Sequence, residues 1–264
     1  MTRADDDAGD VWITSPERGL VERCSTSTGR RIRTIEIQQR PELRNWSIAG
    51  VVGHDGEREL VVGLPSTFNA SSKSAGMCRV YNHECALLRS ISSPPRFDHL
   101  GDYFAGAVIA IPDLDRDGRE DIGLVASSSE SEELVIASGA DGRIFSSLPS
   151  NTDWNPFGSS FDVRAAWPGS ESPVVAIGAW EDIPSWIAVR AISDGHELLR
   201  VEGPTDDSRF GLSVAFIDDV NGDSTPDIAV GRPGPMKAAA LPGGIPDPPQ
   251  PPNPPSTTRP TPAK

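Results

Sequence analysis

Two short loops of this sequence carry the side chains best suited to bind a metal ion. Each loop places an oxygen-bearing side chain at positions 1, 3, 5 and 9 of a nine-residue stretch. These side chains are Asp113, Asp115, Asp117 and Asp121 in the first loop, and Asp219, Asn221, Asp223 and Asp227 in the second. Calcium takes about 6–8 oxygen ligands, and a backbone carbonyl at position 7, from Arg119 or Thr225, would add one more. The 113 loop (residues 113–121) and the 219 loop (residues 219–227) therefore predict two calcium sites.

The residues after each loop argue against a helical calcium motif. An EF-hand carries Glu at position 12 and lies between two helices, whereas position 12 here is Leu124 or Val230. Each loop instead runs into a short apolar stretch, at 122–126 or 228–231, which is typical of a buried strand. The alternative is an Asp-rich hairpin turn that satisfies only its own backbone. Two copies with identical spacing favour the metal site.

The surroundings of the loops repeat along the chain. Phe104, Phe157 and Phe210 recur every 53 residues, and both loops begin nine residues after a Phe. This period is typical of a β-propeller, because kelch-type blades of four strands take about 50 residues. Each unit reads as an inner strand, a loop, an apolar strand, a variable connection and a hairpin. Asp-Gly dipeptides at 141–142 and 194–195 favour tight hairpin turns.

This frame resembles the FG-GAP repeat found in the β-propellers of integrin alpha subunits and of many bacterial surface proteins. The fifth unit has Phe-Gly at 210–211 and Gly-Arg-Pro at 231–233, which fit the repeat. The third unit departs from it, with Phe-Ala at 104–105 and Ala-Ser-Ser at 126–128. The resemblance implies that calcium braces the face bearing the loops and that ligands use the opposite face.

We therefore expect an all-β fold, a β-propeller of four-stranded antiparallel blades. The expected organisation is a disordered acidic N-terminus at 1–9, a propeller at 10–242, and a Pro-rich tail or linker at 243–264. The blades are expected at 10–41 (partial), 46–92, 99–149, 154–204 and 208–242 (partial). Closure into four blades by the N- and C-terminal strands would hide the sheet edges. Five blades, or a fragment of a larger propeller, are the alternatives.

The other units lack a complete set of metal ligands. In the second unit Val51 and Gly53 stand at positions 1 and 3, and Asp55, Gly56 and Glu59 remain as remnants of the loop. The fourth unit has Ala-Trp-Pro-Gly-Ser at 166–170 in place of the acidic loop. We expect only the 113 and 219 loops to bind calcium.

Composition and charge argue against several classes of function. The chain of 264 residues has a net charge of −14, which argues against nucleic acid or an anionic membrane as a partner. No stretch approaches the roughly 20 apolar residues of a membrane span, and no signal peptide is visible. Cys78 and Cys85 lie close enough in sequence to pair, although reduced thiols are the commoner outcome. The four histidines are scattered and no catalytic motif is present, so we expect no enzyme activity.

The expected topology separates the metal from the partner. The variable connections at 65–75, 127–132 and 180–185 should lie on the face opposite the calcium loops. Aromatic residues expected near that face are Phe68, Tyr103, Trp154 and Trp180. We expect a non-enzymatic module that binds a protein or glycan there, at the cell surface or elsewhere outside the cytoplasm, where calcium is abundant. The alternative is an accessory propeller domain of a larger secreted hydrolase or dehydrogenase.

Overall fold

The computed structural model describes residues 10–37, 46–53, 56–65, 76–97, 103–128, 131–150, 160–179, 184–204 and 209–232. The predicted N-terminal segment 1–9 and the Pro-rich tail at 243–264 lie outside these residues. So do Phe68, Trp154 and Trp180, and most of the variable connections. Among the described residues no helix has the length and apolar character needed to cross a membrane.

The described chain folds into five antiparallel sheets, three of them with four strands. The first sheet contains β1 (Asp10–Ser15), β2 (Leu20–Ser25) and β3 (Arg31–Glu36), and the fifth contains β16 (Ser213–Ile217) and β17 (Asp227–Gly231). The second sheet contains β4 (Ser47–Val52), β5 (Arg58–Leu64), β6 (Met77–Tyr81) and β7 (Leu87–Ser92). The third contains β8 (Tyr103–Ile111), β9 (Asp121–Ser127), β10 (Glu132–Ala137) and β11 (Ile144–Pro149), and the fourth contains β12 (Ser160–Arg164), β13 (Val174–Ala179), β14 (Trp186–Ala191) and β15 (Glu197–Glu202). Two short 3-10 helices, η1 (Pro16–Arg18) and η2 (Pro95–Phe97), join strands.

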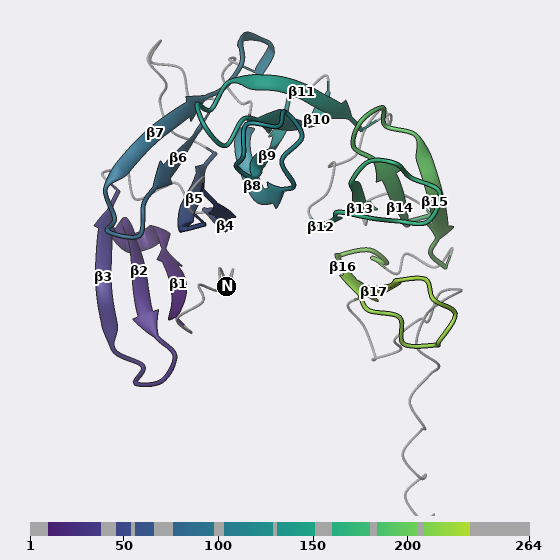
Figure 1. Ribbon diagram of the computed structural model, residues 1–264, viewed down its shortest axis with the longest axis horizontal. Helices are drawn as coiled ribbons and strands as arrows, with labels where there is room; N and C mark the ends of the chain where they lie inside the picture. The colour runs from purple at the N-terminus through teal and green to yellow at the C-terminus, as the bar shows by residue number, and fades with distance from the viewer. Residues whose placement is uncertain are drawn as a thin grey trace, which may run out of the picture.

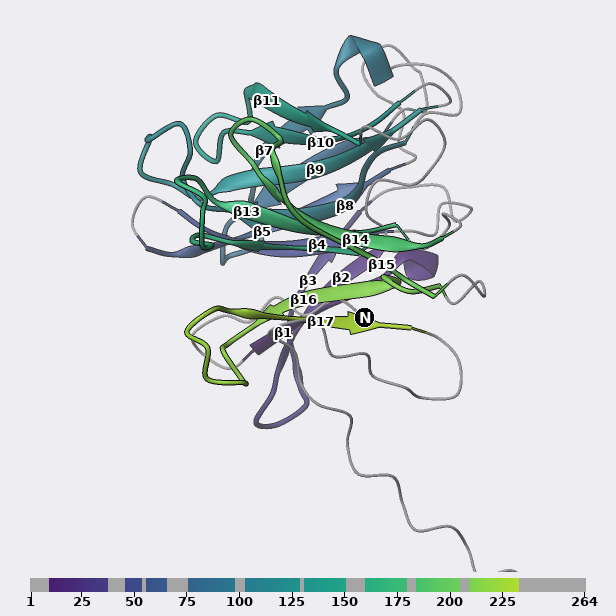
Figure 2. The same cartoon turned by 90° about the vertical axis from the view of Figure 1, so that its right-hand side faces the viewer.

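The five sheets follow one another along an arc (Figure 1). The first strands of consecutive sheets, β4, β8, β12 and β16, lie on the inside of the arc, and the last strands lie on the outside. The side view shows the sheets stacked with their faces toward one another (Figure 2). Among the described strands the end sheets share no strand pairing, so closure of a ring is not shown. The sequence prediction of an all-β fold with four-stranded antiparallel sheets is confirmed.

Four of the five hydrophobic clusters of buried residues in the described chain each fill the space between two consecutive sheets. Strand β13 shows why the middle strands are apolar at every position, since all six of its residues are buried. Val175 and Ile177 pack toward the third sheet, whereas Val174 and Ala176 pack toward the fifth. Because successive side chains of a strand point to opposite faces, a sheet held between two others must be apolar on both. The apolar sequence of the middle strands thus follows from the stacked arrangement.

The hairpins predicted from the sequence are present. The turns after β10 and β14 place Gly142 and Gly195 at positive φ, 75° and 73°, a conformation that glycine adopts without steric cost. The turn between β6 and β7 has Cys85 at the equivalent place, with φ 69°. Cys24, Cys78 and Cys85 are all free thiols, so Cys78 and Cys85 do not form a disulfide. Burial raises the pKa of the Cys78 thiol to about 12.

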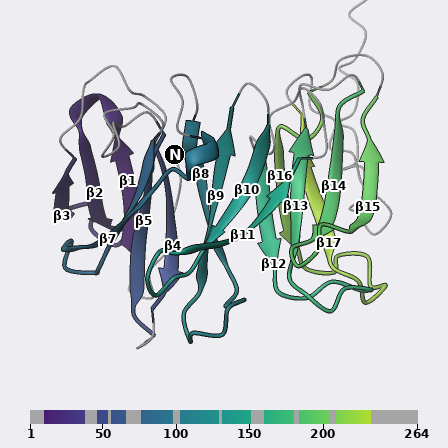
Figure 3. The same ribbon diagram turned by 90° about the horizontal axis from the view of Figure 1, so that it is seen from above.

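The antiparallel topology brings the two acidic loops to the same end of the sheets. The 113 loop joins β8 to β9 and the 219 loop joins β16 to β17, and both project from one rim (Figure 3). The turn after β10 reaches the same rim, because the Gly139 N–H donates to Asp121. Tyr103 begins β8 at the opposite end, and it is 53% exposed. Tyr103 therefore does not pack between the sheets.

Candidate metal centre

The 113 loop curls its carboxylates together. Ligand atoms of Asp113, Asp115 and Asp117 all lie within 4.8 Å of one another. Backbone donors hold this shape: the N–H groups of Asp117 and Gly118 donate to the two carboxylate oxygens of Asp113, at 3.1 and 2.9 Å. Three carboxylates this close repel one another without a cation, and oxygen ligands of this kind suit calcium or magnesium. The described cluster has the composition of a hard-cation site.

The 219 loop follows the same backbone path. Asp219 accepts hydrogen bonds from the N–H groups of Gly222 at 2.6 Å and Ser224 at 2.8 Å. Positive φ occurs at positions 4 and 6 of both loops, namely at Arg116 (64°) and Gly118 (89°), and at Gly222 (82°) and Ser224 (68°). Because φ is positive at the same two positions, the loops turn in the same way. Arg119 and Thr225, predicted to supply a backbone carbonyl, stand at position 7 of the two loops.

The predicted ligand at position 9 of each loop is itself buried and is also the first residue of a strand. Asp121 begins β9 and is fully buried, and Asp227 begins β17 and is 2% exposed. One oxygen of each accepts a hydrogen bond from position 2 of its own loop, with 2.8 Å from Leu114 N to Asp121 Oδ2 and 2.8 Å from Val220 N to Asp227 Oδ2. The other oxygen of Asp227, Oδ1, is buried and accepts no hydrogen bond from the described residues. A buried carboxylate oxygen without a donor is costly unless a cation faces it.

Burial and hydrogen bonding set the ionisation of the loop carboxylates. Burial raises the pKa of Asp121 from 3.8 to about 6, although the N–H groups of Leu114 and Gly139 oppose the shift. The pKa of Asp117 lies below its ordinary value. Burial acts to raise it, but hydrogen bonds from the Ser138 hydroxyl and the Arg119 N–H have the larger combined effect. Hydrogen bonds from the backbone, led by Ser224, lower the pKa of Asp219. The exposed ligands are thus ready to bind a cation, whereas ionised Asp121 is costly without one.

All four buried carboxylates in the described chain occupy the same place in the repeat. Asp121 and Asp227 begin β9 and β17, the second strands of their sheets, and Glu59 is the second residue of β5. Asp10 begins β1, which corresponds to β5 when the three strands of the first sheet are matched to the last three of the second. All four are at most 8% exposed. Two of them are paired with arginine. Arg23 Nε lies 2.9 Å from Asp10, and Arg89 Nη2 lies 2.6 Å from Glu59. Among the described residues no arginine, lysine or histidine pairs with Asp121 or Asp227.

This contrast tests whether a metal fits the loops. A buried carboxylate needs a compensating positive charge. In the first and second sheets a guanidinium provides that charge. The two buried carboxylates without a guanidinium partner, Asp121 and Asp227, are at the ends of the two loops that carry the complete set of oxygen-bearing side chains. The residues of the 113 loop therefore fit a divalent cation, and the 219 loop has oxygen-bearing side chains at the same positions.

The sequence analysis missed three contributors to this rim. The Ser138 hydroxyl donates to Asp117 Oδ2 at 2.7 Å, and the Gly139 N–H donates to Asp121 Oδ1 at 3.2 Å. Both residues follow β10, more than 15 positions after their partners, so local spacing does not reveal them. Asp10 was not predicted because the first unit was expected to begin at residue 10, without a loop before it. Its position directly before an apolar strand, as at Asp121, was the available signal.

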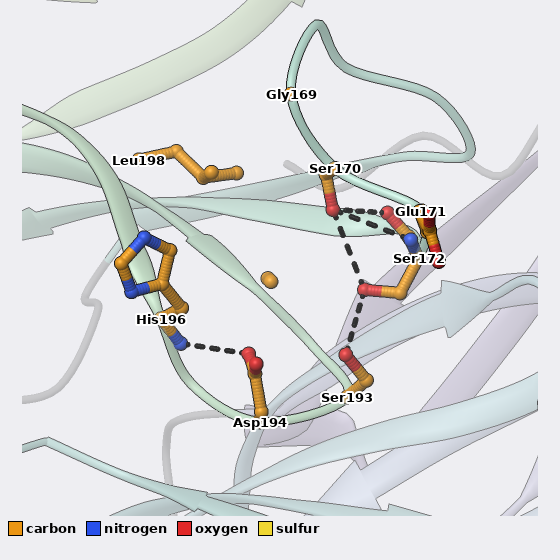
Figure 4. Close-up of a pocket in the computed structure, with 9 residues that line it drawn as sticks. Gly169, Ser170, Glu171, Ser172, Ser193, Asp194, His196 and Leu198 are labelled. Atoms are coloured by element: carbon orange, nitrogen blue, oxygen red, sulfur yellow. Dashed lines mark hydrogen bonds between the residues drawn. The ribbon is translucent and has the colours of Figure 1, made fainter.

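The fourth unit has a hollow instead of an acidic loop. The hollow, about 440 Å³, is lined by Gly169, Ser170, Glu171, Ser172, Ala191, Ser193, Asp194, His196 and Leu198. Figure 4 shows the three serines on one wall and His196 with Leu198 on the other. The hydroxyls bond among themselves and to backbone carbonyls, for example Ser170 Oγ to Ser172 O at 2.8 Å and Ser193 Oγ to Ser172 Oγ at 3.0 Å. Their donors are therefore already used, and the described contacts include none between a serine and the His196 ring.

The geometry of the fifth unit agrees with a known repeat family. Residues 210–244 match the FG-GAP repeat, a stretch that includes β16, the 219 loop and β17. No curated protein matches the chain. The Phe-Gly pair that begins the match has a structural reason, because Gly211 has φ 87°. Ala105 takes the same place before the 113 loop, with φ 62°.

Proposed function

We propose that this chain is a non-enzymatic, calcium-stabilised β-propeller of FG-GAP repeats that serves as an interaction module. The observation that carries the proposal is the set of four buried carboxylates, two neutralised by arginine and two placed at the end of complete acidic loops. Two bound calcium ions would supply the missing positive charge. Calcium is proposed over magnesium because loops rich in carboxylates with a backbone carbonyl suit its larger, more flexible shell.

The proposed role of calcium is to brace the rim. The ligands of each loop come from the loop itself and from the first residue of the following strand. A bound ion would tie the inner strand to its neighbour in the third and fifth sheets. A site of this design holds the fold and leaves the opposite end of the sheets free for a partner.

The proposed partner is a protein or a glycan that binds at the end opposite the loops. Exposed Tyr103 supports this placement, since rigid aromatic side chains give large contact area at low entropic cost. We also propose that the module works outside the cytoplasm, because extracellular calcium modules bind at about 10⁻⁴–10⁻³ M.

Each end sheet has a free strand edge among the described residues, which supports the proposed closure. β1 has no strand on its inner side there, and β17 has no third strand beside it. Pairing between β1 and β17 would join the two sheets into one sheet of five strands and hide both edges. Slow hydrogen exchange of the β1 amides that do not face β2 would support closure, and rapid exchange would contradict it.

Calcium titration by calorimetry tests the central claim. We expect two ions bound per chain, and one in Asp121→Ala and in Asp227→Ala. At a free calcium concentration of about one hundred times Kd, each site should stabilise the fold by about 2.7 kcal/mol. The absence of binding heat, together with equal melting temperatures in calcium and in chelator, would overturn the proposal.

A further inference from the structure

The 113 loop has a second side that faces away from its ligands and contacts the second sheet. Arg119 Nη1 lies 2.8 Å from Glu59 Oε1 on β5. The next residue, Glu120, makes two hydrogen bonds with Val52 at the end of β4: its N–H donates to the Val52 carbonyl at 3.1 Å, and its Oε2 accepts from the Val52 N–H at 2.8 Å. Positions 7 and 8 of the loop are thus fastened to the neighbouring sheet.

Val52 and Glu59, the residues contacted, lie where the second unit would carry an acidic loop of its own. Val52 follows Val51, which stands where a first metal ligand would be, and Glu59 stands at position 9. Glu59 is 8% exposed, and its two oxygens bind Arg89 of the same sheet and Arg119 of the third sheet. Two guanidinium groups therefore contact the carboxylate at position 9 of this unit, the position that Asp121 and Asp227 occupy in the complete loops. One of them, Arg119, belongs to the 113 loop of the next unit.

The 219 loop lacks this second side. Its residues at positions 7 and 8 are Thr225 and Pro226, which carry no charge, and Pro226 has no N–H. The two loops share a backbone path and a set of ligands but differ in these two positions. The chain thus provides its own comparison for what Arg119 and Glu120 do.

We propose that the 113 loop is a clamp, in which cation binding on one side and the Arg119–Glu59 ion pair on the other stabilise each other. The inference rests on the proposed calcium site. The backbone of Arg119 belongs to the loop, so a bound cation that orders the loop also holds the guanidinium in front of Glu59. Coupling between two sites is reciprocal, so the ion pair in turn favours the loop conformation that binds the cation. Calcium would then stabilise the junction between the second and third sheets as well as its own loop.

The calcium affinity of variants that lose a charge tests the clamp. For loss of the Arg119 charge, the clamp predicts weaker calcium binding, whereas simple electrostatics predicts tighter binding. Removing a positive charge beside the loop should tighten calcium binding if charge alone matters. The clamp predicts that Arg119→Gln weakens binding by about fivefold, the low end for coupled sites, because Arg119 is partly exposed. The titration uses the full chain carrying Asp219→Ala and Asp227→Ala, so that only the 113 loop reports. Glu59→Gln should weaken binding to the same degree, and the double variant should show no further loss, since both changes remove one contact.

Glu133→Gln is the matched control. Glu133 pairs with Arg96 at 2.6 Å and joins the segment after β7 to β10, but it does not touch the 113 loop. The Glu133→Gln substitution changes the net charge by the same amount as Glu59→Gln, and we expect it to leave the calcium Kd unchanged. Hydrogen exchange gives an independent readout: calcium should slow the amides of β5 in the parent chain and not in Arg119→Gln.

The outcomes separate the clamp from the proposed function. Equal or tighter calcium binding in Arg119→Gln, with binding intact in the parent chain, overturns the clamp and leaves the metal site standing. Equal weakening by Glu133→Gln and Glu59→Gln also overturns it, because net charge then explains the loss. No calcium binding to the parent chain overturns the metal site and the clamp together.

Discussion

The buried carboxylate of Asp121 predicts how the metal-free protein responds to pH. Its pKa is about 6 in the folded chain, against an ordinary value of 3.8 that applies when the chain is unfolded. Well below pH 3.8 the group is protonated in both states and does not affect stability. As the pH rises toward 7, the unfolded state releases the proton more readily, so the free energy of unfolding falls. A difference of about 2 pKa units at about 1.36 kcal/mol each gives a loss of up to ~3 kcal/mol.

The assay is urea denaturation between pH 4.5 and 7 in calcium-free buffer, for the parent chain and for Asp121→Asn. The asparagine has no charge to bury, so the difference in unfolding free energy between the two proteins should change by about 2 kcal/mol across this pH range, because part of the loss occurs below pH 4.5. Comparing two proteins cancels the titration of the other carboxylates. Saturating calcium should remove most of the decline in the parent chain, because the cation compensates the charge. Parallel pH profiles of the two metal-free proteins would refute the reasoning.

Four further outcomes are expected. Asp227→Ala should lower the calcium stoichiometry from two to one and reduce the stabilisation by calcium by about 2.7 kcal/mol at one hundred times Kd; two remaining sites would contradict this. Cys85→Gly should raise the unfolding free energy by about 0.5–1 kcal/mol, because Cys85 has φ 69°; a lower value in urea denaturation would show that its packing matters more. Gly139→Ala should cost about 1–3 kcal/mol, because a Cβ there would lie 1.9 Å from the Glu120 carbonyl oxygen, whereas Gly106→Ala, with open space around it, should stay within about 0.5 kcal/mol. Tyr103→Ser should leave the melting temperature and the calcium Kd unchanged and weaken binding of the partner, once it is found; a lower melting temperature would show that Tyr103 supports the fold.

Local spacing in the sequence was enough to predict the parts of the site that lie within one loop. The carboxylates at positions 1, 3 and 5 of the 113 loop come together because the backbone turns at positions 4 and 6 of the same loop. The hairpins were predictable for the same reason, since a turn such as Asp141-Gly142 favours its conformation regardless of what surrounds it. The short apolar stretches of the sequence likewise predicted buried strands. The resemblance to the FG-GAP repeat is matched at residues 210–244.

The contacts that join one sheet to the next were decided only by the tertiary structure. Arg119 and Glu59 are 60 residues apart, and nothing in either local sequence indicates that they meet. The same holds for Ser138 and Asp117, which meet because the turn after β10 returns to the rim of the sheet. Whether a buried carboxylate faces a guanidinium or a metal loop depends on which side chains the neighbouring strands and sheets bring to it. The sequence by itself thus determined the two acidic loops and the strands, because both follow from short-range geometry. The stacking of the sheets decided which charged groups of neighbouring sheets pair with each other.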